Sequence, residues 1–272
     1  MKENIKTLTF LNLLFLTILL LSGAFGGVLG KTVYYLAFVL PITMGIYFIA
    51  KQRKTQHGSD DSLKFSIKKQ EFIFALPLFA PTLILIILVS LGLNALMSAF
   101  GIESTASYSD PFWLAVIIHA LIPSIAEELL FRYIPIELIQ GAKHGTVIIL
   151  SSIFFAFAHA SLFSIPYALI AGIVFAATDI KAKSILPSFM LHLLNNILSL
   201  SLMYGAYTLR LAIFIVLGAA SIAGVTVMFV KRKAYAESAK ALFTFSKEEL
   251  TPYPILFVLA SLFIAITNII FS

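Results

Sequence analysis

The chain is organised as long apolar runs separated by short polar stretches. A helix needs about 20 apolar residues to cross the hydrocarbon core of a bilayer. Against that length the sequence predicts apolar helices at residues 7–25, 33–50, 70–98, 111–138, 146–163, 166–179, 184–204, 209–230 and 252–271. The sixth segment is short for a span, and we expect a partial or tilted helix there. The pattern predicts an all-α fold, a polytopic membrane helix bundle with about eight or nine transmembrane helices, in a single domain over residues 1–272.

Composition agrees with this membrane class. The chain is 60% hydrophobic and 12% charged, whereas soluble domains carry about 25% charged residues. Its formal net charge is +6, but most lysines and arginines fall in short loops between apolar runs. There they orient the protein and contact anionic lipid, so we expect no nucleic-acid partner. The absence of cysteine excludes disulfides, thiol nucleophiles and cysteine-ligated metal.

The positions of the positive charges predict an orientation. The loops 51–69 and 231–251 are rich in lysine and arginine, and nine spans place both on the same side as the N-terminus. The loop 99–110 on the other side carries Glu103 and Asp110 instead. Because cytoplasmic loops collect positive charge, we expect a multi-pass protein of the cell membrane with a cytoplasmic N-terminus.

Three ionisable residues lie close together in the fourth apolar segment. Each charge in the hydrocarbon costs roughly 2.5–3.5 kcal/mol on insertion scales, so a group of three needs a reason. Glu128 and Arg132 are four residues apart and share one helix face, where the guanidinium can neutralise the carboxylate. Glu127 is offset by about 100° and is left to face a cavity. Alternatively, all three residues form a structural ion network that holds helices together.

Further polar residues follow in later apolar segments. His159 ends the run Phe155-Ala156-Phe157-Ala158-His159, and His192 shares a helix face with Asn196. Each residue alone is more often a polar contact between helices than a catalyst. Together with Glu127 they supply a general base, two imidazoles and an amide donor, which amide hydrolysis requires.

Other histidines and acids rank lower as candidates. His119 lies two turns before Glu127 on the same helix side, and we expect it to pack in the core. Asp179 and Glu137 lie near the ends of their segments, so we expect them at the membrane interface. The sequence has no His-Glu-x-x-His string, no pair of intramembrane aspartates and no rhomboid-like serine motif.

Three strings on successive helices occur in a fixed order. They are Glu127-Glu128-x-x-x-Arg132, Phe155-x-x-x-His159 and His192-x-x-x-Asn196. In this order the strings resemble the CPBP family of CAAX proteases and bacteriocin-processing enzymes, also called the Abi family. The resemblance covers roughly residues 110–200, which would form the catalytic core. It implies an all-helical intramembrane endopeptidase whose catalytic cavity opens to the membrane and to one aqueous side.

The resemblance also implies roles for these residues. Glu127 and His159 would activate a water molecule, and His192 and Asn196 would stabilise the tetrahedral oxyanion. The remaining charged pair of the first string, Glu128 and Arg132, would support the site.

The family is also commonly called metalloprotease, which leaves a zinc-dependent alternative. Glu127, His159 and His192 would then be the ligands of a catalytic zinc of the His₂Glu kind. That arrangement uses Glu127 as a ligand and leaves Glu128, which is expected to pair with an arginine, as the only base. We therefore favour a mechanism that requires no metal or other cofactor.

The substrate stays open at the level of the sequence. A CAAX protease implies prenylated partners, whereas other members of the family process leader peptides or bacteriocins. We expect a peptide or membrane-protein substrate and contact with the lipid bilayer. A transporter or a non-proteolytic scaffold, such as a bacteriocin immunity protein, is the alternative from another functional class.

Overall fold

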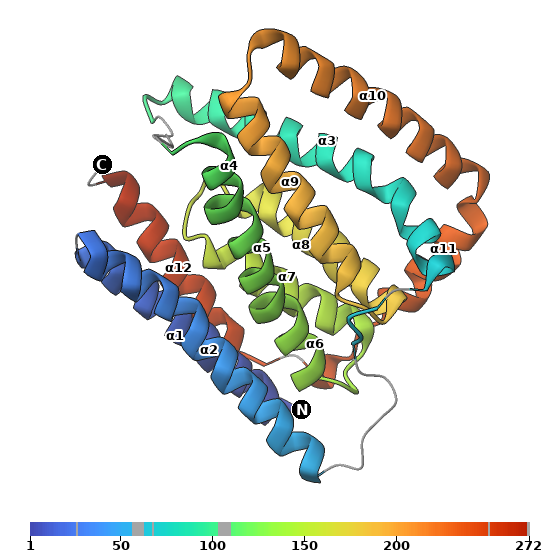
Figure 1. Ribbon diagram of the computed structural model, residues 1–272. Coiled ribbons are helices and arrows are strands. Elements are labelled where there is room, and N and C mark those ends of the chain that lie inside the picture. Colours follow the sequence, from blue (N-terminus) through green and yellow to red (C-terminus); the bar gives the residue numbers. More distant parts are fainter. Residues whose placement is uncertain (26, 56–62, 67, 103–109, 250, 271–272) are drawn as a thin grey trace.

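A computed structural model describes residues 1–25, 27–55, 63–66, 68–102, 110–249 and 251–270 of the chain. These residues form a bundle of helices, as Figure 1 shows, and the all-α prediction is confirmed. The long helices are α1 (Lys2–Ala24), α2 (Gly27–Thr55), α3 (Lys69–Ala99), α7 (His144–Ala158), α8 (Ile165–Ala182), α9 (Leu186–Tyr204), α10 (Tyr207–Val230), α11 (Arg232–Leu242) and α12 (Tyr253–Ile270). Within the described residues, β-pairing is confined to one isolated bridge between Lys64 and Ser184.

Residues 112–138 form a single helical stack that changes its winding twice. Its pieces are α4 (Phe112–Ala115), a π-helical turn (Val116–Leu121), α5 (Ile122–Glu128), a second π-helical turn (Leu129–Tyr133) and α6 (Ile134–Leu138). Each wide turn comes just before a proline, Pro123 or Pro135. Proline lacks an N–H and crowds the carbonyl four residues earlier, so a locally wider turn relieves the clash. The two neighbouring glutamates therefore end the regular segment between the two wide turns.

Each of the apolar segments expected from the sequence is helical, but their lengths differ from the expectation. In the described part of the chain, seven helices are long and apolar enough to cross a membrane. The sixth segment is one of them, because α8 has 18 residues, whereas α7 has only 15. The sixth helix is therefore longer than the sequence indicated, and its tilt in the membrane stays a prediction. The sequence also did not predict α11, a polar helix within a lysine-rich loop.

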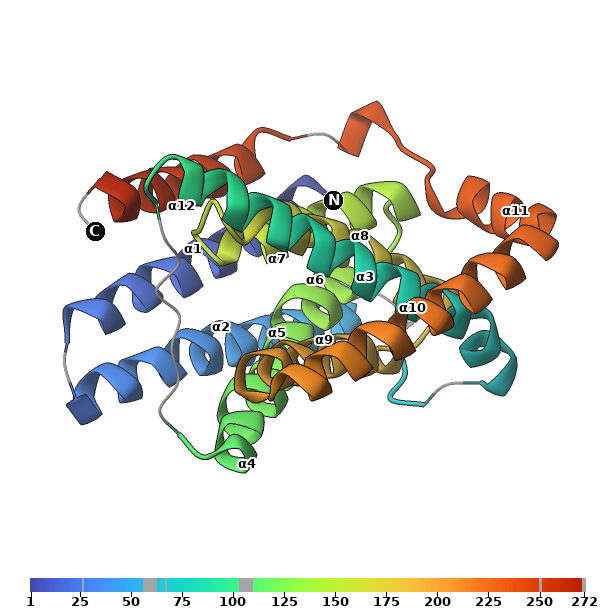
Figure 2. The ribbon, with the colours of Figure 1, turned by 90° about the horizontal axis from the view of Figure 1, so that it is seen from above.

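The helices form three groups across the bundle, which Figure 2 shows from above. Helices α1 and α2 pack together on one side, and α3 and α10 pack together on the other. The stack 112–138 and helices α7, α8 and α9 lie between these pairs, and α12 packs against α1 and α7. Gly172 lets α7 and α8 approach closely, since a Cβ there would lie 3.0 Å from the Cα of Ser152. The central helices are therefore enclosed on two sides by apolar helix pairs.

Two carboxylates expected at the membrane interface are buried within the protein. Asp179 is fully buried, and both its oxygens accept hydrogen bonds from Ser188, one from the backbone N–H and one from the hydroxyl. Glu137 is 3% exposed and accepts hydrogen bonds from the backbone N–H of Leu63 and from the guanidinium of Arg53, both at 2.6 Å. Both carboxylates therefore receive from protein partners the hydrogen bonds that water would otherwise give, and their position relative to the membrane interface stays a prediction.

Candidate active site

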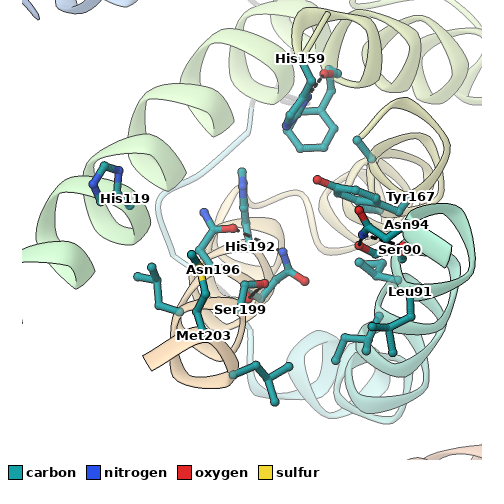
Figure 3. A pocket seen from close by; sticks show the side chains of 18 of the residues that line it. Ser90, Leu91, Asn94, His119, His159, Tyr167, His192, Asn196, Ser199 and Met203 are labelled. Carbon is teal, nitrogen blue, oxygen red and sulfur yellow. Dashed lines mark hydrogen bonds between the residues drawn. The ribbon is translucent and has the colours of Figure 1, made fainter. Parts of the chain in front are cut away.

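A cavity of about 490 Å³ opens between the central helices and α3. Its walls include His159 at the end of α7 and both His192 and Asn196 on α9 (Figure 3). Its remaining polar lining comes from Ser90, Asn94, His119, Tyr167, Asn195 and Ser199. The structure therefore brings three of the four predicted catalytic side chains to one cavity.

His192 is held from behind by Glu128. The ring is 5% exposed, and its Nδ1 lies 2.6 Å from Oε1 of Glu128, which is 1% exposed. A carboxylate only accepts hydrogen bonds, so Nδ1 carries the proton in this contact and Nε2 is the nitrogen that faces away. Phe155 and Phe175 pack against the ring, both with centroids at 5.5 Å. The imidazole thus has a fixed orientation and a fixed tautomer.

The expected ion pair between Glu128 and Arg132 is present but loose. Nε of Arg132 lies 3.6 Å from Oε2 of Glu128, and Arg132 is fully buried. The guanidinium also donates to the carbonyl of Phe131 at 2.9 Å and lies 4.4 Å from the ring centroid of Phe155. Within the described part of the chain, Oε2 of Glu128 and two guanidinium nitrogens of Arg132 have no hydrogen-bond partner. The buried charges therefore offset each other without filling their hydrogen-bonding capacity.

Glu127 lies on the other side of His192. Its Oε2 is 3.7 Å from Nε2 of His192, and its side chain is 17% exposed. It lines a second, smaller cavity of about 150 Å³, which His159 also lines. His159 lines both cavities, so the carboxylate of Glu127 and the imidazole of His159 border the same space. Glu128 thus lies beside Nδ1 of His192, and Glu127 lies nearest to Nε2 of the same ring.

His159 has a defined tautomer as well. Its Nδ1 lies 2.9 Å from the backbone carbonyl of Phe155, one turn earlier in the same helix. A carbonyl oxygen only accepts, so Nδ1 carries the proton and the lone pair of a neutral ring is on Nε2. The Phe155 ring packs edge-on against the imidazole at 5.2 Å. His159 is therefore equipped to accept a hydrogen bond from a water molecule.

Asn196 contributes an amide donor to the same cavity. Its Nδ2 donates to the hydroxyl of Ser124 at 3.3 Å, and its Oδ1 accepts from Asn195 at 3.3 Å. A carboxamide nitrogen has two hydrogens, so one remains for a ligand. His192 precedes Asn196 by one helical turn, and both side chains reach the same space (Figure 3).

The residues of the alternative zinc set do not converge into a metal site. In the described ranges, no three histidine, aspartate or glutamate side chains lie close enough to share an ion. A catalytic zinc site needs three protein ligands at about 2 Å from the metal. The donor arrangement therefore does not fit a zinc ion.

Two residues near the site were misjudged or missed by sequence reasoning. His119 lines the larger cavity rather than packing in the core, and its Nε2 lies 3.7 Å from Oδ2 of Asp110. Asp179 anchors the first turn of α9 through Ser188, which is one helical turn before His192. The four-residue spacing of Ser188 and His192 is visible in the sequence and places both on one helix face. The sequence does not show that Asp179 is the hydrogen-bond partner of Ser188.

The fold and the cavity define a multi-pass membrane protein with a buried group of carboxylate, imidazole and amide side chains. Residues 108–198, about a third of the chain, match the family described as Type II CAAX prenyl endopeptidase Rce1-like. Within residues 108–198 the chain therefore carries an Rce1-like CAAX endopeptidase domain, which confirms the resemblance in its sequence. No curated protein and no solved structure matches the chain.

Proposed function

We propose that this protein is an intramembrane endopeptidase that hydrolyses peptide bonds of membrane-associated proteins or of C-terminal or leader peptides. Glu127 acts as the general base and takes a proton from a water molecule held by Nε2 of His159. The hydroxide adds to the scissile carbonyl carbon, and the carbonyl oxygen becomes an oxyanion. The C–N bond then breaks, and the proton held by Glu127 passes to the leaving amine.

The oxyanion is stabilised from α9. Asn196 donates its second amide hydrogen, and His192 donates from Nε2 when that nitrogen is protonated. The Glu128 carboxylate at Nδ1 then compensates the charge on the ring, as the carboxylate does in a hydrolytic triad. In this account Glu128 and Arg132 support the site, and residues 110–200 form its catalytic core.

The observation that carries this proposal is the placement of His192 between two glutamates. Glu128 is 2.6 Å from Nδ1, and Glu127 is 3.7 Å from Nε2. The buried carboxylate of Glu128 orients the ring, while the partly exposed carboxylate of Glu127 borders the space that a water molecule would occupy. Two adjacent residues of one type thus have different roles because their surroundings differ.

The test is cleavage of a fluorogenic peptide that ends in a farnesylated cysteine and three further residues. The Glu127→Gln variant should lose about 10²–10⁴-fold in kcat, the range that general-base catalysis contributes. It should unfold at the temperature of the wild-type protein, because glutamine keeps the shape of the side chain. Wild-type activity in the Glu127→Gln variant would contradict the proposed mechanism.

We further propose that the N-terminus is cytoplasmic. The chain has no cysteine, so single cysteines report topology without interference. Cysteines at Lys54, Lys183 and Lys233 should be protected from an impermeant reagent in intact cells, and one at Arg210 should be labelled. Labelling at Lys233 with protection at Lys54 would contradict this topology. Glu103, the other position expected on the outside, lies outside the described residues.

A further inference from the structure

A second polar wall faces the catalytic side chains across the cavity. It is formed by Ser90 and Asn94 of α3 (Figure 3), which lie one helical turn apart. Helix α3 contains the most apolar 18-residue stretch among the candidate spans of the described residues. It lies outside the segment that matches the protease family. Polar residues within such a span are costly and are usually functional. Because Ser90 and Asn94 line the cavity, we expect them to act on a molecule bound there rather than in packing between helices.

The polar side chains on the two walls of the cavity use only part of their hydrogen-bonding capacity within the protein. Nδ2 of Asn94 donates to the backbone carbonyl of Ser90 at 2.8 Å. On the facing wall, Asn195 donates to Asn196, and the hydroxyl of Ser199 donates to the carbonyl of Asn195. No donor in the described part of the chain bonds to Oδ1 of Asn94 or to Oδ1 of Asn195. Both carboxamides are half-buried, so each presents an unused acceptor to the cavity.

A peptide substrate of the proposed reaction needs hydrogen-bonding side chains in the cavity. A peptide must leave its helical conformation before its amide bond can be attacked, and this exposes backbone N–H and C=O groups. In the hydrocarbon region no water replaces the lost hydrogen bonds, and each unsatisfied group costs several kcal/mol. An extended chain directs these groups alternately to its two edges. Polar side chains on both sides of the cavity can therefore pair both edges.

We propose that the cavity holds the substrate as an extended peptide between α3 and α9, and that Asn94 and Asn195 bind its backbone. Oδ1 of each asparagine accepts a peptide N–H, one at each edge. Ser90 lies one turn from Asn94 on α3, and Ser199 lies one turn from Asn195 on α9. Each serine extends the row of polar side chains on its own helix. The scissile carbonyl then lies beside Asn196 and His192 on the α9 side.

The remaining lining residues indicate which side chains the peptide carries. Apolar residues flank the polar rows on both helices, namely Ile86, Ile87 and Leu91 on α3 and Leu200, Leu202 and Met203 on α9. Backbone pairing gives affinity without sequence preference, and side-chain pockets add selectivity. The inferred substrate segment is therefore extended and apolar around the cleaved bond. This inference rests on the proposed function.

The test compares Asn94→Leu with a matched control, Asn12→Leu. Asn12 lies on α1 and also donates from Nδ2 to the carbonyl four residues earlier, at 2.8 Å, but it does not line the cavity. With the farnesylated peptide as substrate, Asn94→Leu should raise KM about 10-fold, the value of one net hydrogen bond. Its kcat should stay near the wild-type value, because the contact is made equally in the ground and transition states. Asn12→Leu should leave KM unchanged.

A backbone ester in the peptide makes the assignment more specific. Replacing one amide by an ester removes the N–H that Asn94 accepts. At one position of the peptide this should raise KM about 10-fold for the wild-type protein and should have no further effect on Asn94→Leu. Equal losses in both proteins at every position would overturn the assignment of Asn94. A fall in kcat with unchanged KM would overturn it as well.

Binding to an inactive protein separates this inference from the proposed reaction. The same labelled peptide is titrated against Glu127→Gln and against the Glu127→Gln, Asn94→Leu double variant in lipid nanodiscs. The double variant should bind about 10-fold more weakly, whether or not the wild-type protein cleaves this peptide. Failure of cleavage alone counts against the proposed function. Equal affinity of the two variants counts against the peptide-binding role of α3.

Discussion

Two buried glutamates near an arginine show how similar sequence elements can serve different purposes. Glu137, at the end of the 112–138 stack, accepts 2.6 Å hydrogen bonds from Arg53 and from the N–H of Leu63. Glu128, in the middle of the same stack, lies 3.6 Å from Arg132, and its short contact is with His192. The guanidinium of Arg53 is about half exposed, whereas that of Arg132 is fully buried.

The difference separates a structural site from the proposed catalytic one. Glu137 connects α2, α6 and the segment around Leu63, and short hydrogen bonds satisfy both its oxygens. Around Glu128 the charges balance, but buried polar atoms are left without partners in the described structure. The short hydrogen bond of Glu128 goes to His192, which lines the cavity, whereas those of Glu137 join structural segments. The comparison predicts different results when each carboxylate is replaced.

The largest combined effect should follow from Glu128→Gln. The substitution leaves Arg132 as a buried charge without its partner, which typically costs 3–5 kcal/mol of unfolding free energy. It also removes the carboxylate that fixes the tautomer of His192, so kcat should fall together with the melting temperature. Denaturant unfolding in detergent and the peptide-cleavage assay measure the two effects. Wild-type stability would mean that the ion pair does not hold the site.

Asn196→Ala should affect catalysis alone. Loss of one oxyanion donor lowers kcat by about 10²–10³-fold, whereas the two 3.3 Å contacts of Asn196 contribute little to stability. The matched control is Ser201→Ala on the same helix, since Ser201 bonds only its own helix and does not line the cavity. An equal loss of activity in both variants would indicate a general disturbance of α9.

The smallest effect should come from Glu137→Gln. Glutamine keeps the shape of the side chain, but its amide nitrogen cannot accept a hydrogen bond, so one of the two bonds is lost. The half-exposed side chain of Arg53 regains water. We expect a loss of about 1–3 kcal/mol in unfolding free energy with unchanged kcat. A double-mutant cycle with Arg53→Gln measures the part that belongs to the pair. A loss of activity comparable to that of Glu128→Gln would remove the distinction between the two sites.

The sequence was sufficient for the architecture and for part of the site. The apolar runs predicted the positions of the helices, because every membrane span needs a minimum number of apolar residues. The four-residue spacing of Glu128 and Arg132 gave their shared face, since that geometry is local. Helix α11 was missed because it is polar and lies between apolar runs.

Long-range contacts could not be predicted in the same way. The bond between Glu128 and His192 joins residues 64 apart, and the partners of Asp179 and Glu137 depend on how separate helices pack. Burial is a property of that packing, so a position near the end of an apolar run was a poor guide to it. Nothing local in the sequence indicated that the polar residues of α3 would face the histidines.

The central claim is that Glu127 activates water without a metal ion. It is tested most directly by measuring the cleavage rate and zinc content of the purified protein after exhaustive chelation. The account predicts an unchanged rate with no stoichiometric zinc. A rate that is lost on chelation and restored by zinc would contradict it. In that case one zinc per chain, absent from the His159→Ala and His192→Ala variants, would make Glu127 a metal ligand.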